Sequence, residues 1–330
     1  MTRTRTGTYP HRSRSVGDTC HRPRRPSALS CSIVTAQSSR SVATNPMPAP
    51  ILVIGATGNV GRGVVGSLIA RQVAVRAAVR TLSGTQRPGI DEVLFDVQSP
   101  ATFAPALAGC HGLFLLRPPA ISQVASTLVP LIDEAERQGL EQTVFPSVAG
   151  ADKNPLIPHH AVEKRLQAGS MAWTFLRAGF FAQNLCDAYR QDIQAGEIWL
   201  PAGAGRAAFV DAQDLGEVAA KALNEGVLQR EAPQLTGPQA LSFFDVAQML
   251  TEELGRPIRY RPVGPLRYAH HVMKQGLPLA QAAVQTVLHM GLRLGQAEAV
   301  DPRLGQIFGR PAHTLRDVIR RNLQRWAAVP

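Results

Sequence analysis

Residues 51–61 read I-L-V-I-G-A-T-G-N-V-G, and this stretch decides the fold of the chain. Its four consecutive aliphatic residues predict a strand that is buried on both faces. The apolar residues that follow recur at the spacing of one helix face: Val60, Val64, Leu68 and Ile69. The sequence therefore predicts a strand, a glycine-rich turn and a helix in immediate succession.

The glycines of this stretch, Gly55, Gly58 and Gly61, have the spacing G-x-x-G-x-x-G. The first permits a tight turn, the second lets the backbone approach a pyrophosphate at the helix N-terminus, and the third lets helix and strand pack closely. A glycine triplet alone also fits a flexible loop, but the flanking strand and helix favour dinucleotide binding. The other turn residues expected to contact the cofactor are Thr57, Asn59 and Val60.

The second predicted strand, residues 73–79, ends at Arg80, and this residue bears on the choice of cofactor. Between Gly55 and Ile90 there are five arginines and no Asp or Glu. NAD is usually held there by a carboxylate that binds the ribose 2′-hydroxyl, whereas an arginine suits the 2′-phosphate of NADP. Arg80 also fits a solvated loop position, but the missing acid favours NADP(H).

Further short strands are predicted at 93–95, 112–116, 143–145 and 173–176, with helical segments between them. This alternation predicts an α/β fold with a doubly wound parallel sheet of the Rossmann type. Ligands bind beyond the carboxyl ends of such strands. The residues expected at that edge, besides Arg80, are Asp96, Leu116, Arg117 and Ser147, of which Asp96 either caps the next turn or lies near the adenine.

Several local signals predict where individual elements begin and end. Residues 122–138 are expected to be helical, with Pro130 causing a kink or starting a new first turn. Ser147 is expected just beyond its strand. Residues 266–295 and 313–326 each read as one helix, a capping box is expected at 242–245, and Asp211 or Asp214 is expected to cap a helix.

The first 46 residues hold eight arginines and one acid, so they contribute +7 of the net charge of +11. They lack an apolar pattern and are expected to be disordered. A basic arm, a transit peptide and an upstream extension of the coding frame are all possible readings, and we favour the last, since Met47 precedes the first strand closely. The predicted organisation is a tail (1–48), an NADP-binding domain (49–180) and a substrate domain (181–330) with some elements returning to the first.

Composition excludes several classes of protein. Apolar residues make up 45% and charged residues 18% of the chain, as in a globular protein with a sizeable core. Without the tail the net charge is +4, which gives no reason to expect a nucleic-acid partner. No apolar run reaches about 18 residues, so no membrane partner is expected. The cysteines lack C-x-x-C or metal-ligand spacing, which predicts reduced thiols, no metal site and a cytoplasmic location: Cys20, Cys31, Cys110 and Cys186.

Taken in order, these motifs resemble the NmrA-like family, an atypical branch of the short-chain dehydrogenase/reductase superfamily. The resemblance spans residues 51–326 and rests on G-A-T-G-N-V-G at 55–61, Val79-Arg80, Ser147, Pro158-His159-His160 with Glu163, T-F-L-R-A-G-F-F-A-Q-N-L at 174–185, Phe209-Val210-Asp211 with Asp214, and Leu235-Thr236-Gly237-Pro238. It implies an NADP(H)-binding domain and a smaller C-terminal substrate domain. Members of the family include quinone and azo-dye reductases, and also regulators that bind the nucleotide without turnover.

The usual catalytic motif of the superfamily, Y-x-x-x-K, is absent. The residues four positions after Tyr9, Tyr189, Tyr260 and Tyr268 are Ser13, Ile193, Gly264 and Val272. His160 lies thirteen residues after Ser147 and four before Lys164, which resembles the serine, tyrosine and lysine arrangement with a histidine in the tyrosine's place. A histidine is able to deliver a proton near neutral pH. The alternative is that His159 and His160 open a helix and contact the nicotinamide ribose or a backbone carbonyl, with Lys164 solvated.

Reduction of a quinone or azo group places little demand on a positioned acid, because the cofactor supplies the hydride. Phe180 and Phe181 suit a flat acceptor, and Asn184 is able to orient a carbonyl, although core packing also explains at least one of the two phenylalanines. The sequence favours an NADPH-dependent reductase of small electron acceptors. The second hypothesis is an NADP(H) sensor that acts through a protein partner, and a sugar-nucleotide epimerase is weaker because the tyrosine is missing.

Overall fold

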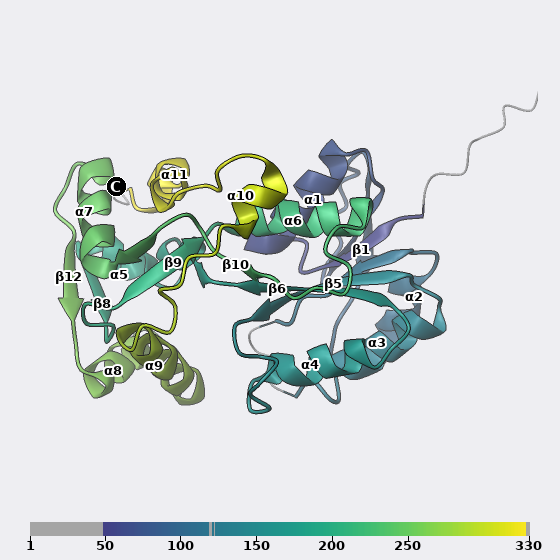
Figure 1. Cartoon of the computed structure of the whole chain (residues 1–330), viewed down its shortest axis with the longest axis horizontal. Coiled ribbons are helices and arrows are strands. Elements are labelled where there is room, and N and C mark those ends of the chain that lie inside the picture. The colour runs from purple at the N-terminus through teal and green to yellow at the C-terminus, as the bar shows by residue number, and fades with distance from the viewer. Residues whose placement is uncertain (1–48, 119–120, 122, 328–330) are drawn as a thin grey trace, which may run out of the picture. The chain divides into compact units, whose positions relative to one another are not determined.

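The computed structural model describes residues 49–118, 121 and 123–327, so the expectations for the tail, Cys20 and Cys31 lie outside the described residues. Among these residues, seven parallel strands form one sheet in the order β10-β6-β5-β4-β1-β2-β3 (Figure 1). The expected doubly wound α/β fold is confirmed. The strands are β1 (Ile51–Ile54), β2 (Val75–Val79), β3 (Ile90–Leu94), β4 (Gly112–Phe114), β5 (Gln142–Val148), β6 (Ala172–Ala178) and β10 (Gln234–Leu235).

Helices cover both faces of this sheet, and the alternation of β1 decides which residues meet which layer. Ile51 and Val53 belong to a core shared with α1 (Asn59–Ala70) and α6 (Ala212–Glu225). Leu52 and Ile54 belong to a core on the opposite face, whose helices are α2 (Phe103–Leu107), α3 (Leu128–Arg137) and α4 (Pro158–Gln167). Both faces of β1 are buried, as its run of aliphatic residues predicts.

The helices α1 and α6 pack unusually close together, and glycines make this possible. A Cβ atom added to Gly216 would lie 2.6 Å from the backbone carbon of Gly63, too close for any side chain. The helix α6 therefore packs against the helix that follows the glycine stretch 55–61, although α6 begins some 150 residues after it. The short helix α10 (Arg303–Phe308) and β10 join the same part of the molecule.

The C-terminal residues build a further core of their own around buried aromatic side chains such as Phe243, Tyr268 and Trp326. Two small sheets, β11-β9-β7 and β12-β8, carry it. Its strands are β7 (Phe180–Phe181), β8 (Glu197–Leu200), β9 (Arg206–Val210), β11 (Ala240–Ser242) and β12 (Arg259–Pro262). Its helices are η2 (Ala182–Leu185), α5 (Arg190–Gln194), α7 (Phe243–Leu254), α8 (Pro265–Lys274), α9 (Leu279–Arg293), α11 (Leu315–Arg321) and η3 (Leu323–Arg325).

Local capping signals are confirmed. The Asp211 side chain accepts a hydrogen bond from the Gln213 N–H and begins α6. Ser242 and Asp245 form the expected capping box of α7, and Gly255 ends that helix with a positive φ. Pro130 lies in the first turn of α3, where its missing N–H costs nothing. Of the two expectations for Pro130, a new first turn is therefore confirmed and a kink is not.

Four expectations about elements are wrong. Ser147 lies within β5 and not beyond it. The helical segment 122–138 begins as a helix only at Leu128. Residues 266–295 form two helices, because Gly276, with φ +95°, and Pro278 interrupt them. The last helix covers Leu315–Arg321 and is followed by a short 3-10 turn, because Thr314 and Asp317 form the capping box that starts it.

Cys110 and Cys186 are buried and free. Within the described part of the chain, the helices are all too short or too polar to cross a lipid bilayer.

Candidate functional site

The glycine turn between β1 and α1 leaves the first N–H groups of the helix without hydrogen-bond partners among the described residues. Gly55 has φ +71°, and a Cβ on Gly61 would overlap the Gly55 carbonyl group. Gly58 is the N-cap and supplies no side-chain cap, and the first turn of α1 contains no acidic residue. The free N–H groups and the positive end of the helix dipole therefore face the turn, which is the arrangement that binds a phosphate group.

The neighbouring strand tips place the other predicted cofactor residues around this turn. Arg80 follows β2 directly and is exposed. Leu116, after β4, lies so close to Gly55 that a Cβ on the glycine would overlap its side chain. The Asp96 carboxylate accepts a hydrogen bond from the Gln98 N–H at 2.9 Å, so Asp96 caps a turn after β3.

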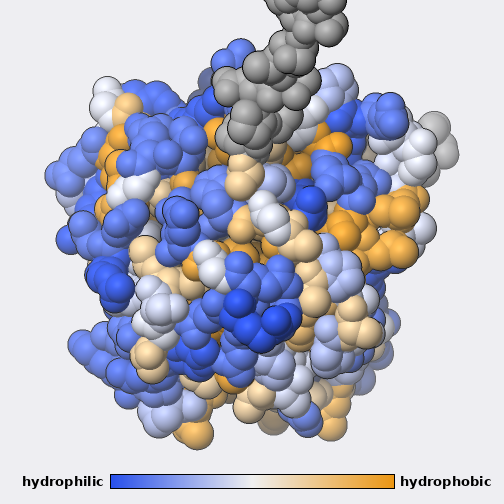
Figure 2. All heavy atoms as spheres, turned by 90° about the vertical axis from the view of Figure 1, so that its right-hand side faces the viewer, coloured by the Kyte–Doolittle hydropathy of each residue, from blue (hydrophilic) through white to orange (hydrophobic). Residues whose placement is uncertain are grey.

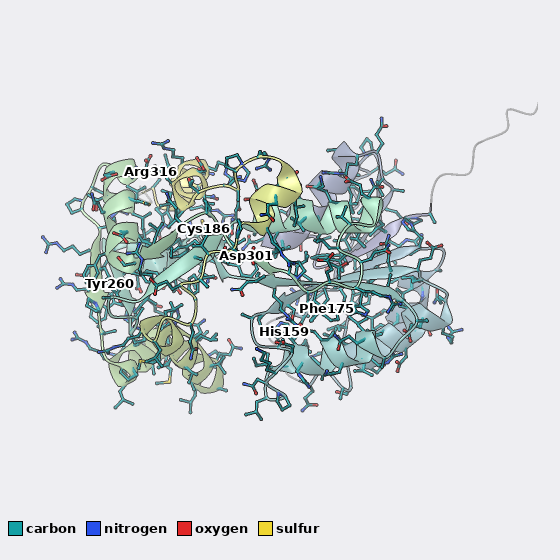
Figure 3. All side chains as sticks on the ribbon, in the orientation of Figure 1. His159, Phe175, Cys186, Tyr260, Asp301 and Arg316 are labelled. Atoms are coloured by element: carbon teal, nitrogen blue, oxygen red, sulfur yellow. The ribbon has the colours of Figure 1, made fainter. Side chains whose placement is uncertain are left out.

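Arg117 and His159 meet at the carboxyl ends of β4 and β5. The Arg117 Nε–H donates to His159 Nε2 at 3.3 Å, and the same guanidinium donates to the Ile121 carbonyl oxygen at 2.5 Å. The His159 ring lies against Phe145 of β5, with 5.6 Å between ring centroids. Figure 3 marks the position of His159 near the start of α4. Burial, and then the positive charge of Arg117, lowers the pKa of His159 to about 4.

This contact determines the tautomer of His159. Because Arg117 only donates, His159 Nε2 must accept, and the proton of the neutral ring lies on Nδ1. That Nδ1 atom is buried and has no hydrogen-bond partner among the described residues. A buried donor without an acceptor is costly, so an acceptor that came within hydrogen-bond distance of this N–H would stabilise the site.

Ser147 belongs to a buried hydrogen-bonded network that joins β5, α4 and β6. Its hydroxyl donates to Glu163 Oε1 at 2.6 Å. Arg177 donates to both oxygens of the same carboxylate, at 3.2 and 2.7 Å, which raises the pKa of Arg177. Glu163 lies between Val162 and Leu166 on the buried face of α4, and an acid at such a position is the signal that sequence reasoning passed over.

The proposed catalytic set of Ser147, His160 and Lys164 is not joined by hydrogen bonds among the described residues. His160 Nδ1 lies 2.7 Å from the Ala151 carbonyl oxygen, so its ring holds the loop that follows β5. Lys164 is exposed on α4. His159, which the sequence analysis left out of the catalytic set, is the histidine that contacts another predicted site residue, Arg117.

The predicted acceptor residues begin the C-terminal part of the chain, directly after β6. Phe180 packs edge-on against Phe209, Phe243 and His289 and remains partly accessible. Phe181 packs against the core shared with α1 and α6. Asn184 is partly accessible in η2.

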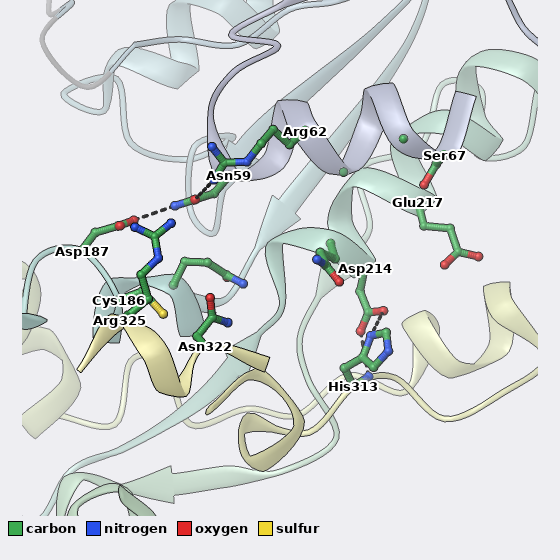
Figure 4. A pocket seen from close by; sticks show the side chains of 14 residues that line it. Asn59, Arg62, Ser67, Cys186, Asp187, Asp214, Glu217, His313, Asn322 and Arg325 are labelled. Atoms are coloured by element: carbon green, nitrogen blue, oxygen red, sulfur yellow. Dashed lines mark hydrogen bonds and ion pairs between the residues drawn. The ribbon is translucent and has the colours of Figure 1, made fainter. Parts of the chain in front are cut away.

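A cavity of about 420 Å³ lies between the first turn of α1, η2, α6 and the C-terminal segment (Figure 4). At its edge, Asn59 of the glycine turn donates a hydrogen bond to the Asp187 carboxylate at 2.7 Å. Arg62 donates to the Thr57 carbonyl oxygen and to the Asn59 side chain. The Asn59–Asp187 bond therefore ties the glycine turn to the C-terminal part of the chain.

Within the described residues, one group of side chains has a spacing that a metal ion would accept: Asp211, Asp214 and His313, with ligand atoms within 4.8 Å of one another. Their atoms already have partners. His313 Nδ1 lies 2.6 Å from Asp214, and Gln183 and Arg321 donate to Asp211. The group is explained as the contact that fixes residues 309–321 against the start of α6.

Comparisons with known proteins agree with this geometry. The model of the NmrA-like family matches residues 47–320. An NAD(P)H azoreductase from Xenophilus azovorans is 31% identical over 287 residues, which cover 84% of this chain and all of the relative.

Two solved structures have the same fold. An NADPH-dependent quinone oxidoreductase from Escherichia coli, in complex with NADPH, is 25% identical with a TM-score of 0.74, covering 82% of this chain and 99% of that one. The triphenylmethane reductase of Citrobacter sp., in complex with NADP(H), is 22% identical with a TM-score of 0.72, covering 83% and 99%.

Proposed function

This chain belongs to the NmrA-like family, and we propose that it is an NADPH-dependent oxidoreductase that reduces small, flat acceptors such as quinones or azo compounds. The observation that carries the proposal is the glycine turn, whose free N–H groups and bare helix N-terminus suit a pyrophosphate. The names of the azoreductase and quinone oxidoreductase relatives support the choice of acceptor.

The residues around the turn fit NADP(H) in particular. A side chain at Gly61 would overlap the Gly55 carbonyl group, so the glycine lets α1 start close against the turn that is proposed to hold the pyrophosphate. Arg80 at the tip of β2 is exposed and positioned to pair with a 2′-phosphate, and the segment between Gly55 and Ile90 offers no carboxylate to a 2′-hydroxyl. Thr57, Asn59, Val60, Leu116 and Arg117 complete the proposed cofactor site, with Asp96 shaping its rim.

When bound, the cofactor supplies a hydride, and the reduction of a quinone to a hydroquinone also needs one proton from solvent. We assign His159 the role of hydrogen-bond donor to the bound molecules, because its low pKa keeps the ring neutral near pH 7. Arg117 holds that ring and the segment after β4 in place.

The roles proposed for Ser147, His160 and Lys164 follow from their contacts. Ser147 positions the Glu163–Arg177 pair beneath the site, and His160 holds the loop at Ala151. Lys164, exposed on α4, is free to interact with solvent. Phe180, Phe181 and Asn184 form the acceptor side, where a half-buried ring offers an apolar surface to a flat molecule.

The free, buried thiols of Cys110 and Cys186 fit a reducing compartment such as the cytoplasm, which is where we place the protein.

The test is a panel assay with the purified full chain. NADPH or NADH is mixed with menadione, 1,4-benzoquinone or methyl red, and the loss of cofactor absorbance is followed against controls without protein. We expect turnover that depends on both NADPH and acceptor, with NADPH preferred at least tenfold in kcat/KM. Binding of NADPH without turnover on any acceptor would contradict the reductase and support a sensor with a protein partner.

A further inference from the structure

The helix α9 is apolar on two opposite faces, but only one of them is covered. Ala282, His289 and Leu292 pack into the C-terminal core. On the other side Leu279, Val284, Val287 and Leu288 are 60–71% exposed. A helix that is apolar all round is normally buried on all sides, so this face is built for contact with something outside the described residues.

The exposed apolar residues are concentrated in this region. Six of the eleven large hydrophobic residues that are strongly exposed in the described part of the chain lie between residues 266 and 294: Leu266, Leu279, Val284, Val287, Leu288 and Leu294. Figure 1 shows α8 and α9 at the periphery of the C-terminal part, at the lower left below β8 and β12. Figure 2 shows the face on the right-hand side of Figure 1, away from α8 and α9. On this face hydrophilic and hydrophobic residues are intermixed.

The charge of the same region has a single sign. Residues 255–297 contain six Lys or Arg and no Asp or Glu. Arg261 pairs with Glu197 of a neighbouring strand, and His271 lies 2.9 Å from Asp192. Three further cations are exposed: Arg267 and Lys274 lie on α8, and Arg293 is the last residue of α9. None of the three forms an ion pair with another described residue.

We propose that the α8–α9 hairpin docks on the surface of a lipid bilayer that carries anionic headgroups. The outer face of α9 presents four large apolar side chains and one polar side chain, Gln281, so it suits the acyl boundary, while the nearby cations suit the headgroups. A second copy of the same face would bring like charges together, and the Arg-rich tail of this chain has the same sign. A helix that lies on a membrane needs no spanning segment, so the docking is compatible with the lengths of the helices.

The position of α9 indicates that docking would bring the proposed acceptor side close to the bilayer. This step rests on the proposed function. His289 on the inner face of α9 packs against Phe180 of the proposed acceptor side, with 6.2 Å between ring centroids. The helix thus lies between the acceptor side and the proposed bilayer surface. The acceptor class that fits is a lipid-soluble quinone with an apolar tail.

The docking test uses the full chain and sedimentation with vesicles. One set is phosphatidylcholine alone, and the other contains phosphatidylglycerol at about three lipids in ten. We expect binding to the anionic vesicles that weakens with salt, and at least about tenfold weaker binding for the double variant V287E/L288E. The matched control L94E/V300E makes the same charge change at two residues of 51% and 45% exposure and leaves vesicle binding unchanged.

The tail is present in every variant, so the difference between the two double variants reports on α9. Unchanged NADPH binding and thermal unfolding show that V287E/L288E is folded. The proposal is overturned if the full chain ignores anionic vesicles or if V287E/L288E binds them as tightly as the control. It is also overturned if sedimentation equilibrium shows a dimer that V287E/L288E dissociates while vesicles are not bound.

The acceptor step has its own readout. With soluble menadione, V287E/L288E turns over like the control, whereas with a long-chain quinone embedded in anionic vesicles its rate falls at least about tenfold. Failure of turnover with both acceptors contradicts the proposed function and leaves the sedimentation result standing.

Discussion

At the scale of single residues, Arg80 carries the proposed choice between NADPH and NADH. It lies exposed at the tip of β2, next to the glycine turn. A charge-assisted contact with a phosphate group contributes about 1.5–3 kcal/mol, which corresponds to about tenfold to more than a hundredfold in affinity. We predict that Arg80→Ala weakens NADPH binding by that factor and leaves NADH binding within about twofold, as measured by fluorescence titration.

Arg87→Ala is the matched control for this change. Arg87 lies in the same loop, but it is paired with Glu92 at 2.8 Å. Its loss should leave the NADPH affinity nearly unchanged. Equal effects of the two substitutions would mean that the general charge of the loop, and not Arg80, selects the cofactor.

The network of Ser147, Glu163 and Arg177 gives a second prediction. Glu163 is 1% exposed and accepts bonds from both partners, so Glu163→Gln leaves a buried carboxamide where two charge-assisted bonds were made. We expect Glu163→Gln to lower the free energy of unfolding by about 2–3 kcal/mol and Ser147→Ala by about 1 kcal/mol in urea titrations. For Ser147→Ala we expect kcat within about threefold of the unchanged chain. Normal stability with abolished turnover would assign Ser147 to proton transfer instead.

Two buried histidines make the stability dependent on pH. Burial lowers the pKa of both His159 and His289 to about 4, below the ordinary value of 6.5. Between these values the unfolded chain binds protons that the folded chain does not, so stability is full above about pH 6.5 and falls as the pH drops toward 4. The maximal loss is about 3.5 kcal/mol for each histidine, because the pKa falls from 6.5 to about 4 and one pKa unit corresponds to about 1.4 kcal/mol.

Urea unfolding at pH 7 and pH 5 checks this dependence. The variants His159→Gln and His289→Gln should each show a smaller loss of stability between the two pH values. His270→Gln, at an exposed position of α8, should show the same loss as the unchanged chain. A loss that is identical in all three variants would rule out these two histidines as its source.

At the scale of elements, the close packing of α1 on α6 gives a prediction with an internal control. A Cβ on Gly216 would lie 2.6 Å from backbone atoms of Gly63 and Val64, which are unable to move aside cheaply. We expect Gly216→Ala to destabilise the protein by about 1–3 kcal/mol. A Cβ added to Gly66 of α1 would have no other atom within 4 Å. We therefore expect Gly66→Ala to stabilise the protein by about 0.5–1 kcal/mol. Thermal unfolding that moves in the same direction for both variants would contradict this packing argument.

The elements also show which parts of the fold can be predicted from sequence. The strand and helix of residues 51–70 and the caps at Asp211 and Ser242 follow from local patterns, because each depends on residues within a few positions of one another. The strands β7, β11 and β12 have two to four residues each and are stabilised by partners far along the chain, so local patterns do not reveal them. The break between α8 and α9 had a local signal, Gly276 and Pro278, which the continuing apolar residues on both sides obscured.

At the scale of the whole molecule, some features of the candidate site can be predicted from the sequence and others cannot. The residues of the cofactor side follow from the rule that parallel strands present their carboxyl ends at one edge, and the sheet order places them there. The partners of the polar side chains are tertiary: Arg117 meets His159 across 42 residues and Asn59 meets Asp187 across 128. No spacing rule predicts such pairs, which is why the sequence analysis placed His160 in the catalytic set by its spacing and did not predict the contact of His159 with Arg117.

NADPH binding by the glycine turn is tested by a calorimetric titration of NADPH into the purified full chain and into the variant Gly61→Ala. A Cβ at this position overlaps the Gly55 carbonyl group and distorts the turn. We predict that each chain binds one NADPH, more tightly than NADH, and that a Gly61→Ala variant that unfolds cooperatively like the unchanged chain binds NADPH at least about tenfold more weakly. Absence of NADPH binding to the unchanged chain, or equal binding by the folded variant, would contradict this prediction.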